Sequence, residues 1–322
     1  MPAPMSTTPD RPLRFDGRGV IVTGAGNGLG RAYALLFARL GARVLVNDLG
    51  GSVAGEGASG TAADAVVAEI RRAGGEGAAN HESVEDGVRV VEAALDAFGR
   101  VDVVVNNAGI LRDAAFHHMT DAEWERVYAV HGLGAFRVTR AAWPHLRAQG
   151  YGRVLFTSSA SGIYGSFGQA NYAFNKLGLY GLTRTLAIEG RSKGIHVNAI
   201  APSAGSRMME GIVPPAIHAA LKPEAVAPVA AWLCHASCPE TGALFEVGAG
   251  YVGKLRWQRS RGALFSPADA YSVDDVAARW AEVVDMAGAD APESGADVYR
   301  HFLPNFTPEA VAEAIAAAGP RA

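Results

Sequence analysis

The sequence predicts an α/β protein with a doubly wound parallel sheet, and two features support this prediction. Short runs rich in Val and Ile alternate with longer Ala-rich stretches, which is the pattern of βαβ units. The strand-forming runs are continuously apolar rather than alternating, as expected when helices cover both faces of a sheet. The chain has 322 residues, so one large domain of about 250 residues with an appendage is the natural division.

The expected elements follow one another in a regular order. One helix should begin at about Asp121, and other helical stretches are expected at 31–40, 61–73, 84–98 and 169–193. Strand-forming runs lie at 20–23, 43–47, 101–105, 153–157, 195–200 and 243–247. With one further strand included, we predict seven parallel strands in the sheet.

The helix near Asp121 carries its own start and stop signals. Thr120 and Glu123 form a capping box at its beginning. Pro144 lacks a backbone N–H, so it should kink or end this helix.

The two ends of the chain differ from its middle. Residues 1–12 carry four prolines and no apolar stretch, which predicts a disordered leader. After Gly250, 72 residues remain, without a strand pattern but with amphipathic stretches at 273–286 and 308–318. We therefore expect a main domain at 13–250 and a mostly helical C-terminal extension at 251–322.

Composition narrows the choice of partners. The formal net charge of -3 leaves no basic surface for nucleic acid or anionic membranes, so a small-molecule substrate is the expected ligand. No run of about eighteen apolar residues occurs, so no membrane-spanning helix is expected. The two cysteines, Cys234 and Cys238, provide no disulfide framework, which predicts a cytoplasmic protein. Their C-x-x-x-C spacing lacks a fourth ligand, so no metal site is expected.

A glycine-rich loop follows the first strand and leads directly into a helix. Its spacing is G-x-x-x-G-x-G, and a loop in this context is a pyrophosphate site because glycine lets the backbone approach the phosphates. The helix N-terminus adds unpaired N–H groups that attract an anion. A tight glycine turn without a ligand is the alternative. The candidate cofactor-binding residues here are Gly24, Asn27, Gly28, Leu29 and Gly30.

Asp48 ends the second strand, eighteen residues after Gly30. A carboxylate in this place can accept both hydroxyls of an adenosine ribose and repels a 2′-phosphate, which predicts NAD rather than NADP. A solvated loop carboxylate or a cap is the alternative. The stretch 48–61 contains five glycines and is expected to be a mobile loop near the cofactor.

A reacting centre is predicted from Ser159, Tyr172 and Lys176. The four-residue offset between Tyr172 and Lys176 places the phenol and the ammonium on the same face of a helix. The ammonium should favour tyrosinate and so lower the pKa of the phenol, because it stabilises the charged form. Lys176 could also bind the nicotinamide ribose, while Ser159, after the strand at 153–157, could hold the substrate oxygen.

These motifs together resemble the short-chain dehydrogenase/reductase family over about 13–250. The resemblance implies a Rossmann fold and catalytic Ser159, Tyr172 and Lys176, the last two also binding the cofactor. It further implies cofactor contacts from the turn at 106–109, from two residues after strand three and from the loop after strand six. These residues are Asn107, Ala108, Gly109, Ser83, Val84, Pro202, Ala204, Gly205, Ser206 and Arg207.

Within this family the resemblance is closest to the (3R)-hydroxyacyl-CoA dehydrogenase region of type 2 peroxisomal multifunctional enzymes. The segments that carry it are 163–165, 167–172, 204–208, 232–235, 244–250 and 253–257, together with the glycine-rich loop after Asp48. It implies an NAD-dependent alcohol oxidoreductase that converts (3R)-3-hydroxyacyl-CoA to 3-oxoacyl-CoA.

His131 stands where the family pattern has an Asn that holds a water in a proton relay. An imidazole could serve that relay or could fill the helix interface, and the sequence leaves both interpretations open.

Other functions share these residues. Oxidation of a steroid hydroxyl and NADPH-dependent reduction of 3-oxoacyl groups on acyl carrier protein are two enzyme alternatives, and Asp48 argues against the second. A regulatory NAD-binding module without catalysis is a third, which the intact Ser159, Tyr172 and Lys176 oppose. The helices around 121–149 and 169–193 carry Ala- and Gly-rich faces, and the family resemblance implies a homodimer or homotetramer.

Overall fold

The structure is a computed structural model that describes residues 12–204, 214 and 220–318. The chain divides into two compact units, residues 1–255 and 256–322. The first unit extends five residues past the expected boundary at Gly250, because 251–255 form a strand that pairs with the sheet. This strand was not predicted, because 251–255 were assigned to the helical extension. The expected leader at 1–12 lies almost wholly outside the described residues.

The first unit is built on one eight-stranded sheet with the order β3-β2-β1-β4-β5-β6-β7-β8. Seven strands are parallel, as predicted, and β8 is antiparallel to β7. The strands are β1 Gly19–Thr23, β2 Arg43–Asn47, β3 Glu76–Asn80, β4 Val103–Asn106, β5 Gly152–Thr157, β6 Ile195–Ser203, β7 Leu244–Gly248 and β8 Tyr251–Leu255.

A two-residue turn joins β7 to β8. Ala249 and Gly250 both have positive φ, at 47° and 83°, between the paired residues Gly248 and Tyr251. Turns with two positive-φ residues match the twist of an antiparallel pair. The antiparallel edge strand is thus a consequence of the turn.

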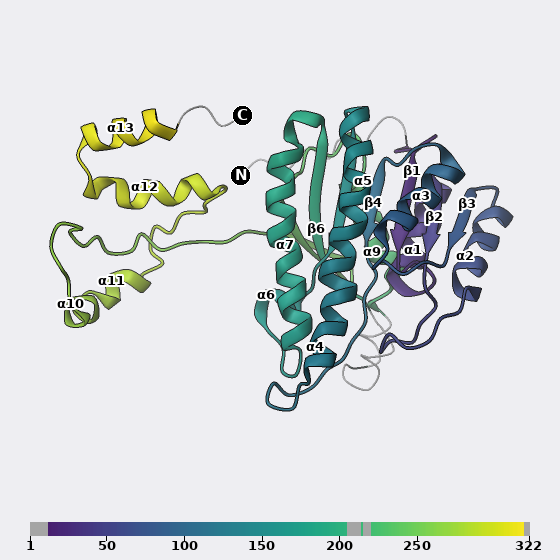
Figure 1. Ribbon diagram of the computed structural model, residues 1–322, viewed down its shortest axis with the longest axis horizontal. Helices are drawn as coiled ribbons and strands as arrows, with labels where there is room; N and C mark the ends of the chain where they lie inside the picture. The colour runs from purple at the N-terminus through teal and green to yellow at the C-terminus, as the bar shows by residue number, and fades with distance from the viewer. Residues whose placement is uncertain (1–11, 205–213, 215–219, 319–322) are drawn as a thin grey trace. The chain divides into compact units, whose positions relative to one another are not determined.

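Helices cover both faces of the sheet (Figure 1), as a doubly wound fold requires. Alternate residues of β1 show the division, since Val20 and Val22 belong to one buried cluster and Ile21 to the other. The first cluster takes its helical side chains from α1 Gly28–Arg39, α2 Thr61–Arg72 and α9 Pro223–Leu233. The second takes them from α3 Gly87–Phe98, α5 Ala135–Gln149 and α7 Ala170–Gly190.

The helix expected near Asp121 forms, with an irregularity in its middle. It begins as α4 Asp121–Tyr128, passes through a π-helical segment at Ala129–Gly134, and continues as α5. The capping box is present: Thr120 Oγ1 accepts the Glu123 N–H at 3.3 Å, and the Glu123 carboxylate accepts the Thr120 N–H at 2.8 Å. Pro144 lies inside α5 and does not end it, so that half of the expectation is wrong.

The second unit is a set of short helices, as the amphipathic stretches predict. They are α10 Val273–Ala278, α11 Trp280–Val284, α12 Tyr299–Phe302 and α13 Pro308–Ala318. The Asp290 carboxylate lies 3.0 Å from Arg259 Nη2 and 2.8 Å from His301 Nε2, so it joins α12 to the segment that precedes α10. Across the described residues, no helix is long and apolar enough to cross a membrane.

Candidate active site

The candidate site residues within the described ranges gather at one edge of the sheet. Parallel strands end at the same edge, and ligands of doubly wound folds bind there. The glycine loop follows β1, Asp48 follows β2, and Ser159 follows β5, while α7 carries Tyr172 and Lys176. Loops and one helix thus bring together residues that are more than 100 positions apart in the sequence.

The glycine loop has the geometry of a phosphate cradle. Gly24 and Gly28 have φ of +62° and +52°, a region that favours glycine. A Cβ at Gly24 would lie 2.7 Å from Ala108 Cα, whereas no described atom lies within 4 Å of a Cβ at Gly28. Asn27 precedes α1 without a side-chain cap, and the first turn carries no acidic residue. The free N–H groups and the open side of Gly28 fit an anionic pyrophosphate.

Asn107 clamps the turn after β4 to this loop. Its Nδ2 donates to the carbonyl oxygens of Thr23 and Gly24 at 3.0 and 3.1 Å. Thr23 Oγ1 in turn accepts the N–H groups of Asn107 and Ala108 at 3.0 and 3.1 Å. The Asn107 side chain therefore holds the glycine loop in shape. The position of Asn107 in the sequence did not distinguish this structural role from a contact with the cofactor.

Asp48 is held beside the glycine loop by two backbone N–H groups. Its Oδ2 accepts from Gly26 and its Oδ1 from Gly50, both at 2.7 Å. This fixes a carboxylate beside the glycine loop, where the sequence predicts contact with the adenosine ribose.

The residues expected after β3 and β6 take different positions. Ser83 Oγ accepts the Glu85 N–H at 3.2 Å, and Val84 is buried. Pro202 belongs to β6 rather than to the loop after it, and Ala204 follows the strand. Gly205, Ser206 and Arg207 lie outside the described residues.

Ser159, Tyr172 and Lys176 are brought together as predicted. Ser159 caps a short helix, α6 Ala160–Tyr164, by accepting the Ser161 N–H at 3.2 Å, and its interaction with Tyr172 lowers the pKa of the phenol. The Lys176 ammonium donates to the Thr157 carbonyl oxygen at 2.7 Å and lies 5.3 Å from the centre of the Tyr172 ring. A hydroxyl, a phenol and an amine thus converge beside the glycine-loop edge, a set that can move a proton to or from an alcohol oxygen.

Burial has the strongest influence on these groups. It lowers the pKa of Lys176 to about 7, because the side chain is 3% exposed and has no carboxylate partner among the described residues. Burial also raises the pKa of Tyr172, and the hydrogen bond from Ser159 only partly opposes this shift. The lowered tyrosine pKa that the Tyr172–Lys176 spacing predicts is therefore not found in the protein alone.

His131 lies in the π-helical segment and touches the reacting centre. Its ring meets the Tyr172 ring edge-on at 5.2 Å, and Nε2 lies 2.9 Å from the Ile110 nitrogen and 2.8 Å from its oxygen. Burial and the charge of Lys176 lower its pKa to about 3, so the imidazole is neutral. Nδ1 is buried and has no hydrogen-bond partner among the residues that the structure describes. A short π segment at such a place is frequent at functional sites.

The family follows from comparison with known proteins. A family model described as short chain dehydrogenase matches residues 18–212. The chain belongs to the short-chain dehydrogenase family. Peroxisomal multifunctional enzyme type 2 of Mus musculus is 58% identical over 287 residues, 88% of this chain. The chain spans 39% of the length of that relative.

Two solved structures share this short-chain dehydrogenase fold. One from Mycobacterium avium is 40% identical with a TM-score of 0.74, covering 84% of this chain and 96% of its own. The other, a 7α-hydroxysteroid dehydrogenase in complex with NADH and 7-oxo glycochenodeoxycholic acid, is 28% identical with a TM-score of 0.66. It covers 74% of this chain and 95% of its own. This short-chain dehydrogenase is an oxidoreductase with a nicotinamide cofactor, and its glycine loop fits that group.

Several polar residues of this dehydrogenase's site were missed by the sequence analysis. Ser158 Oγ donates to the Lys176 carbonyl oxygen at 2.7 Å, and Thr157 supplies the carbonyl that holds the ammonium. Asn171 and Asn175 are buried on α7, and no described residue bonds Asn175 Oδ1. The signal available was two Asn at a four-residue spacing in a helix, where Asn is unfavourable without a reason.

The weaker signals of the sequence have structural explanations. Cys234 and Cys238 are buried free thiols, and the described residues contain no group of three or more His, Cys, Asp or Glu side chains that could hold a metal. Two cations that follow the start of β8 are also paired within the chain, Lys254 with Glu240 at 2.7 Å and Arg259 with Asp290 at 3.0 Å.

Proposed function

We propose that this dehydrogenase oxidises the 3-hydroxyl group of (3R)-3-hydroxyacyl-CoA to a ketone with NAD as hydride acceptor. The observation that carries the proposal is the convergence of Ser159, Tyr172 and Lys176 beside the glycine loop. The substrate class rests on the segments around Tyr172 that resemble (3R)-hydroxyacyl-CoA dehydrogenases. The identity of 58% to a multifunctional enzyme over 88% of the chain supports it.

Each of the three residues has a task in this reaction, and Tyr172 and Lys176 also contact the cofactor, Lys176 at the nicotinamide ribose. Tyr172, as tyrosinate, takes the hydroxyl proton, and Ser159 holds the same oxygen through its hydroxyl. Lys176 in its charged form stabilises the tyrosinate, and the Thr157 carbonyl holds the ammonium in place. The nicotinamide ring, when bound, accepts the hydride.

NAD rather than NADP is part of the proposal, and Asp48 supports it. Its carboxylate is fixed by Gly26 and Gly50 at the end of β2, where it would accept ribose hydroxyls and repel a 2′-phosphate. Titration with both nucleotides tests this point, and tighter binding of NADPH would contradict it. Asp48→Asn should weaken the preference, because it removes the negative charge.

The substrate is tested by following NAD reduction with a panel of (3R)-hydroxyacyl-CoA thioesters of increasing chain length. The (3S) thioesters are the matched control, and wild-type protein should discriminate against them. Failure to reduce NAD with every chain length would overturn the proposal. Steroid alcohols belong in the same panel, because a 7α-hydroxysteroid dehydrogenase shares the fold at a TM-score of 0.66. Faster turnover of a steroid would favour that second candidate.

Tyr172→Phe separates an enzyme from a regulatory NAD-binding module. The variant keeps the ring against His131 but loses the hydroxyl, so turnover should fall about 10²- to 10⁴-fold while NAD binding is retained. A regulatory module would lose nothing measurable.

We also propose that the protein forms a homodimer, with a homotetramer as the larger alternative. Helix α7 exposes Phe174, Leu177 and Ile188 at 58, 39 and 59%, an apolar surface that a second copy could cover. Light scattering of wild type and Ile188→Glu tests it, since the variant should shift toward monomer. Cytoplasmic location remains part of the proposal, and cell fractionation tests it against the peroxisome named for the relatives.

A further inference from the structure

The glycine-rich segment between β2 and α2, residues 49–60, is an ordered loop that we call the strap. Its base is closed by the Ser59 N–H, which donates to the Leu49 carbonyl oxygen at 2.9 Å. Its tip is a turn in which Ser52 and Glu56 pair, with a Ser52 N–H to Glu56 oxygen distance of 2.7 Å. The strap is therefore a folded loop with a defined tip, in spite of its glycines.

The tip of the strap is bound to the segment that follows β4. Arg112 Nε donates to the Ala54 carbonyl oxygen at 2.7 Å, and Arg112 Nη2 lies 3.2 Å from Glu56 Oε1. The Leu111 N–H donates to the Val53 carbonyl oxygen at 3.0 Å. Three bonds thus connect the strap tip with two consecutive residues.

The topology of the sheet decides what the strap crosses. β1 lies between β2 and β4, so a loop that starts after β2 and is bound to residues after β4 passes the carboxyl end of β1. The glycine loop begins at that end, and Asp48 at the base of the strap bonds both Gly26 and Gly50. The strap therefore runs beside the proposed dinucleotide site.

We propose that Arg112 is a positioning residue that latches the strap across the dinucleotide site, so that the cofactor is released only when the latch opens. The inference rests on the proposed function, because it takes a nicotinamide dinucleotide as the ligand. The latch is reversible, since Glu56 is largely exposed and an exposed ion pair adds little. Most of the strength of the latch comes from the hydrogen bond that Arg112 Nε donates to the Ala54 carbonyl oxygen.

The same segment holds the helix of the reacting tyrosine. The Arg112 carbonyl oxygen accepts Asn171 Nδ2 at 2.9 Å, and Asn171 is fully buried directly before Tyr172. Asp113 Oδ2 accepts Gln169 Nε2 at 2.7 Å. Arg112 thus bonds the strap through its side chain and Asn171 of α7 through its backbone carbonyl. The strap and the helix that carries Tyr172 are therefore both held by the same residue.

The test compares Arg112→Ala and Arg112→Lys with a matched control, Arg71→Ala. Arg71 also donates to a backbone carbonyl, that of Gly77 at 3.0 Å, but between α2 and β3 at the amino edge. Stopped-flow measurement of NADH release should show a rate about tenfold higher in Arg112→Ala, as expected for one lost charged hydrogen bond. Arg112→Lys should lie between, and Arg71→Ala should match wild type.

Proteolysis provides a readout that does not depend on turnover. A glutamate-specific protease cuts after Glu56 only when the strap is open, so NAD should protect the wild type more than Arg112→Ala, as followed by mass spectrometry. Gly55→Ala tests the strap without touching Arg112. Gly55 has φ of +77°, and its Cβ would lie 2.9 Å from Ile110 Cδ1, so this variant should also release NADH faster.

Wild-type release rates and unchanged protection in Arg112→Ala would overturn the latch while leaving the proposed function intact. A wild-type protein that binds neither NAD nor NADP would overturn the proposed function and the latch with it. Binding titration of the wild type, done first, distinguishes the two failures.

Discussion

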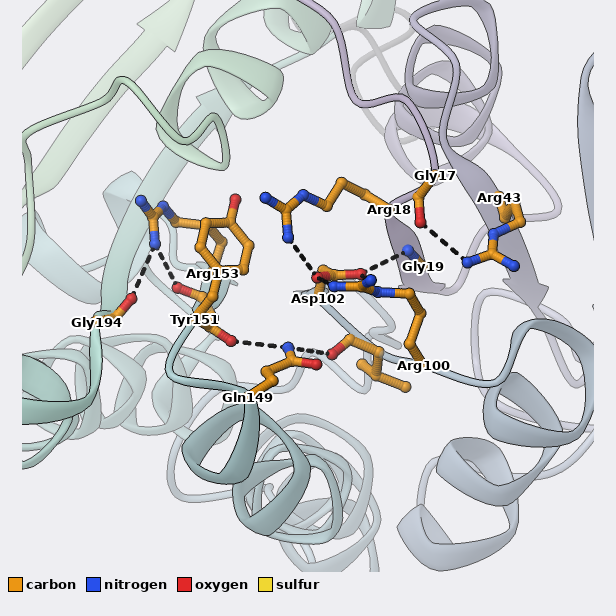
Figure 2. Close-up of polar contacts among 12 residues, drawn as sticks. Gly17, Arg18, Gly19, Arg43, Arg100, Asp102, Gln149, Tyr151, Arg153 and Gly194 are labelled. Carbon is orange, nitrogen blue, oxygen red and sulfur yellow. Dashed lines mark hydrogen bonds and ion pairs between the residues drawn. The ribbon is translucent and has the colours of Figure 1, made fainter.

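At the amino edge of the sheet the buried charge of Asp102 is paired with two guanidiniums, whereas at the carboxyl edge the buried Lys176 has no carboxylate partner among the described residues. Figure 2 shows Arg18, Arg100 and the Gly19 N–H converging on Asp102, at distances of 2.6 to 2.9 Å. Burial alone would raise the pKa of Asp102, but the bonds from Arg100, Gly19 and Arg18 outweigh it and keep the pKa below its usual value.

At the carboxyl edge, more buried polar atoms lack a hydrogen-bond partner among the described residues than at the amino edge. Lys176 bonds a neutral carbonyl. Three further atoms there are buried and have no hydrogen-bond partner within the described part of the chain: His131 Nδ1, Asn175 Oδ1 and Thr157 Oγ1. Burying such groups costs free energy unless a ligand or water completes them. The comparison indicates that the amino edge stabilises the fold, while the carboxyl edge gives up stability to hold reactive groups.

Removing Asp102 tests the amino edge and should have the largest effect on stability. Asp102→Ala leaves two guanidiniums and the Gly19 N–H without their acceptor, so the free energy of unfolding should fall by about 3 kcal/mol. Urea unfolding measures it. Turnover per folded molecule should stay at the wild-type value, because Asp102 lies at the edge opposite Tyr172. Asp16→Ala, which removes an exposed partner of Arg14, is the control and should change little.

Lys176→Met tests the carboxyl edge through the pH dependence of stability. The pKa of Lys176 is about 7 in the folded protein against 10.5 for the free side chain, so the unfolded state binds one more proton between these values. Stability of the wild type relative to the variant should therefore rise with pH across that window. Urea unfolding of both proteins at several pH values measures it, and parallel curves would show that Lys176 is not desolvated.

His131→Asn should have the smallest effect. With a pKa of about 3 the imidazole is neutral at ordinary pH, so its titration should not shape the pH dependence of turnover. We expect a profile of unchanged shape and a loss of turnover well below that of Tyr172→Phe. A loss as large as that of Tyr172→Phe would mean that the ring takes part in the proton relay.

Most of the fold could be predicted because it follows from local patterns. Continuous apolar runs such as β1 and β4 indicated buried parallel strands, and all seven parallel strands are present. β8 was missed because an Ala-Gly turn with two positive φ angles has no strong signal. The helix that was expected to reach residue 149 does so without ending at Pro144, because packing against the sheet outweighs one absent hydrogen bond.

The sequence alone determined which chemical groups the site holds, since a glycine spacing and a Tyr-x-x-x-Lys offset are local geometry. Only the tertiary structure decided the pKa values of these groups. Burial lowers the pKa of Lys176 and raises that of Tyr172, against the shift that their spacing predicted for the tyrosine. The tertiary structure also decided that Arg112, for which the sequence predicted no role, joins the strap to the helix of Tyr172. Burial and long-range contacts depend on the packing of distant segments, which spacing along the chain does not record.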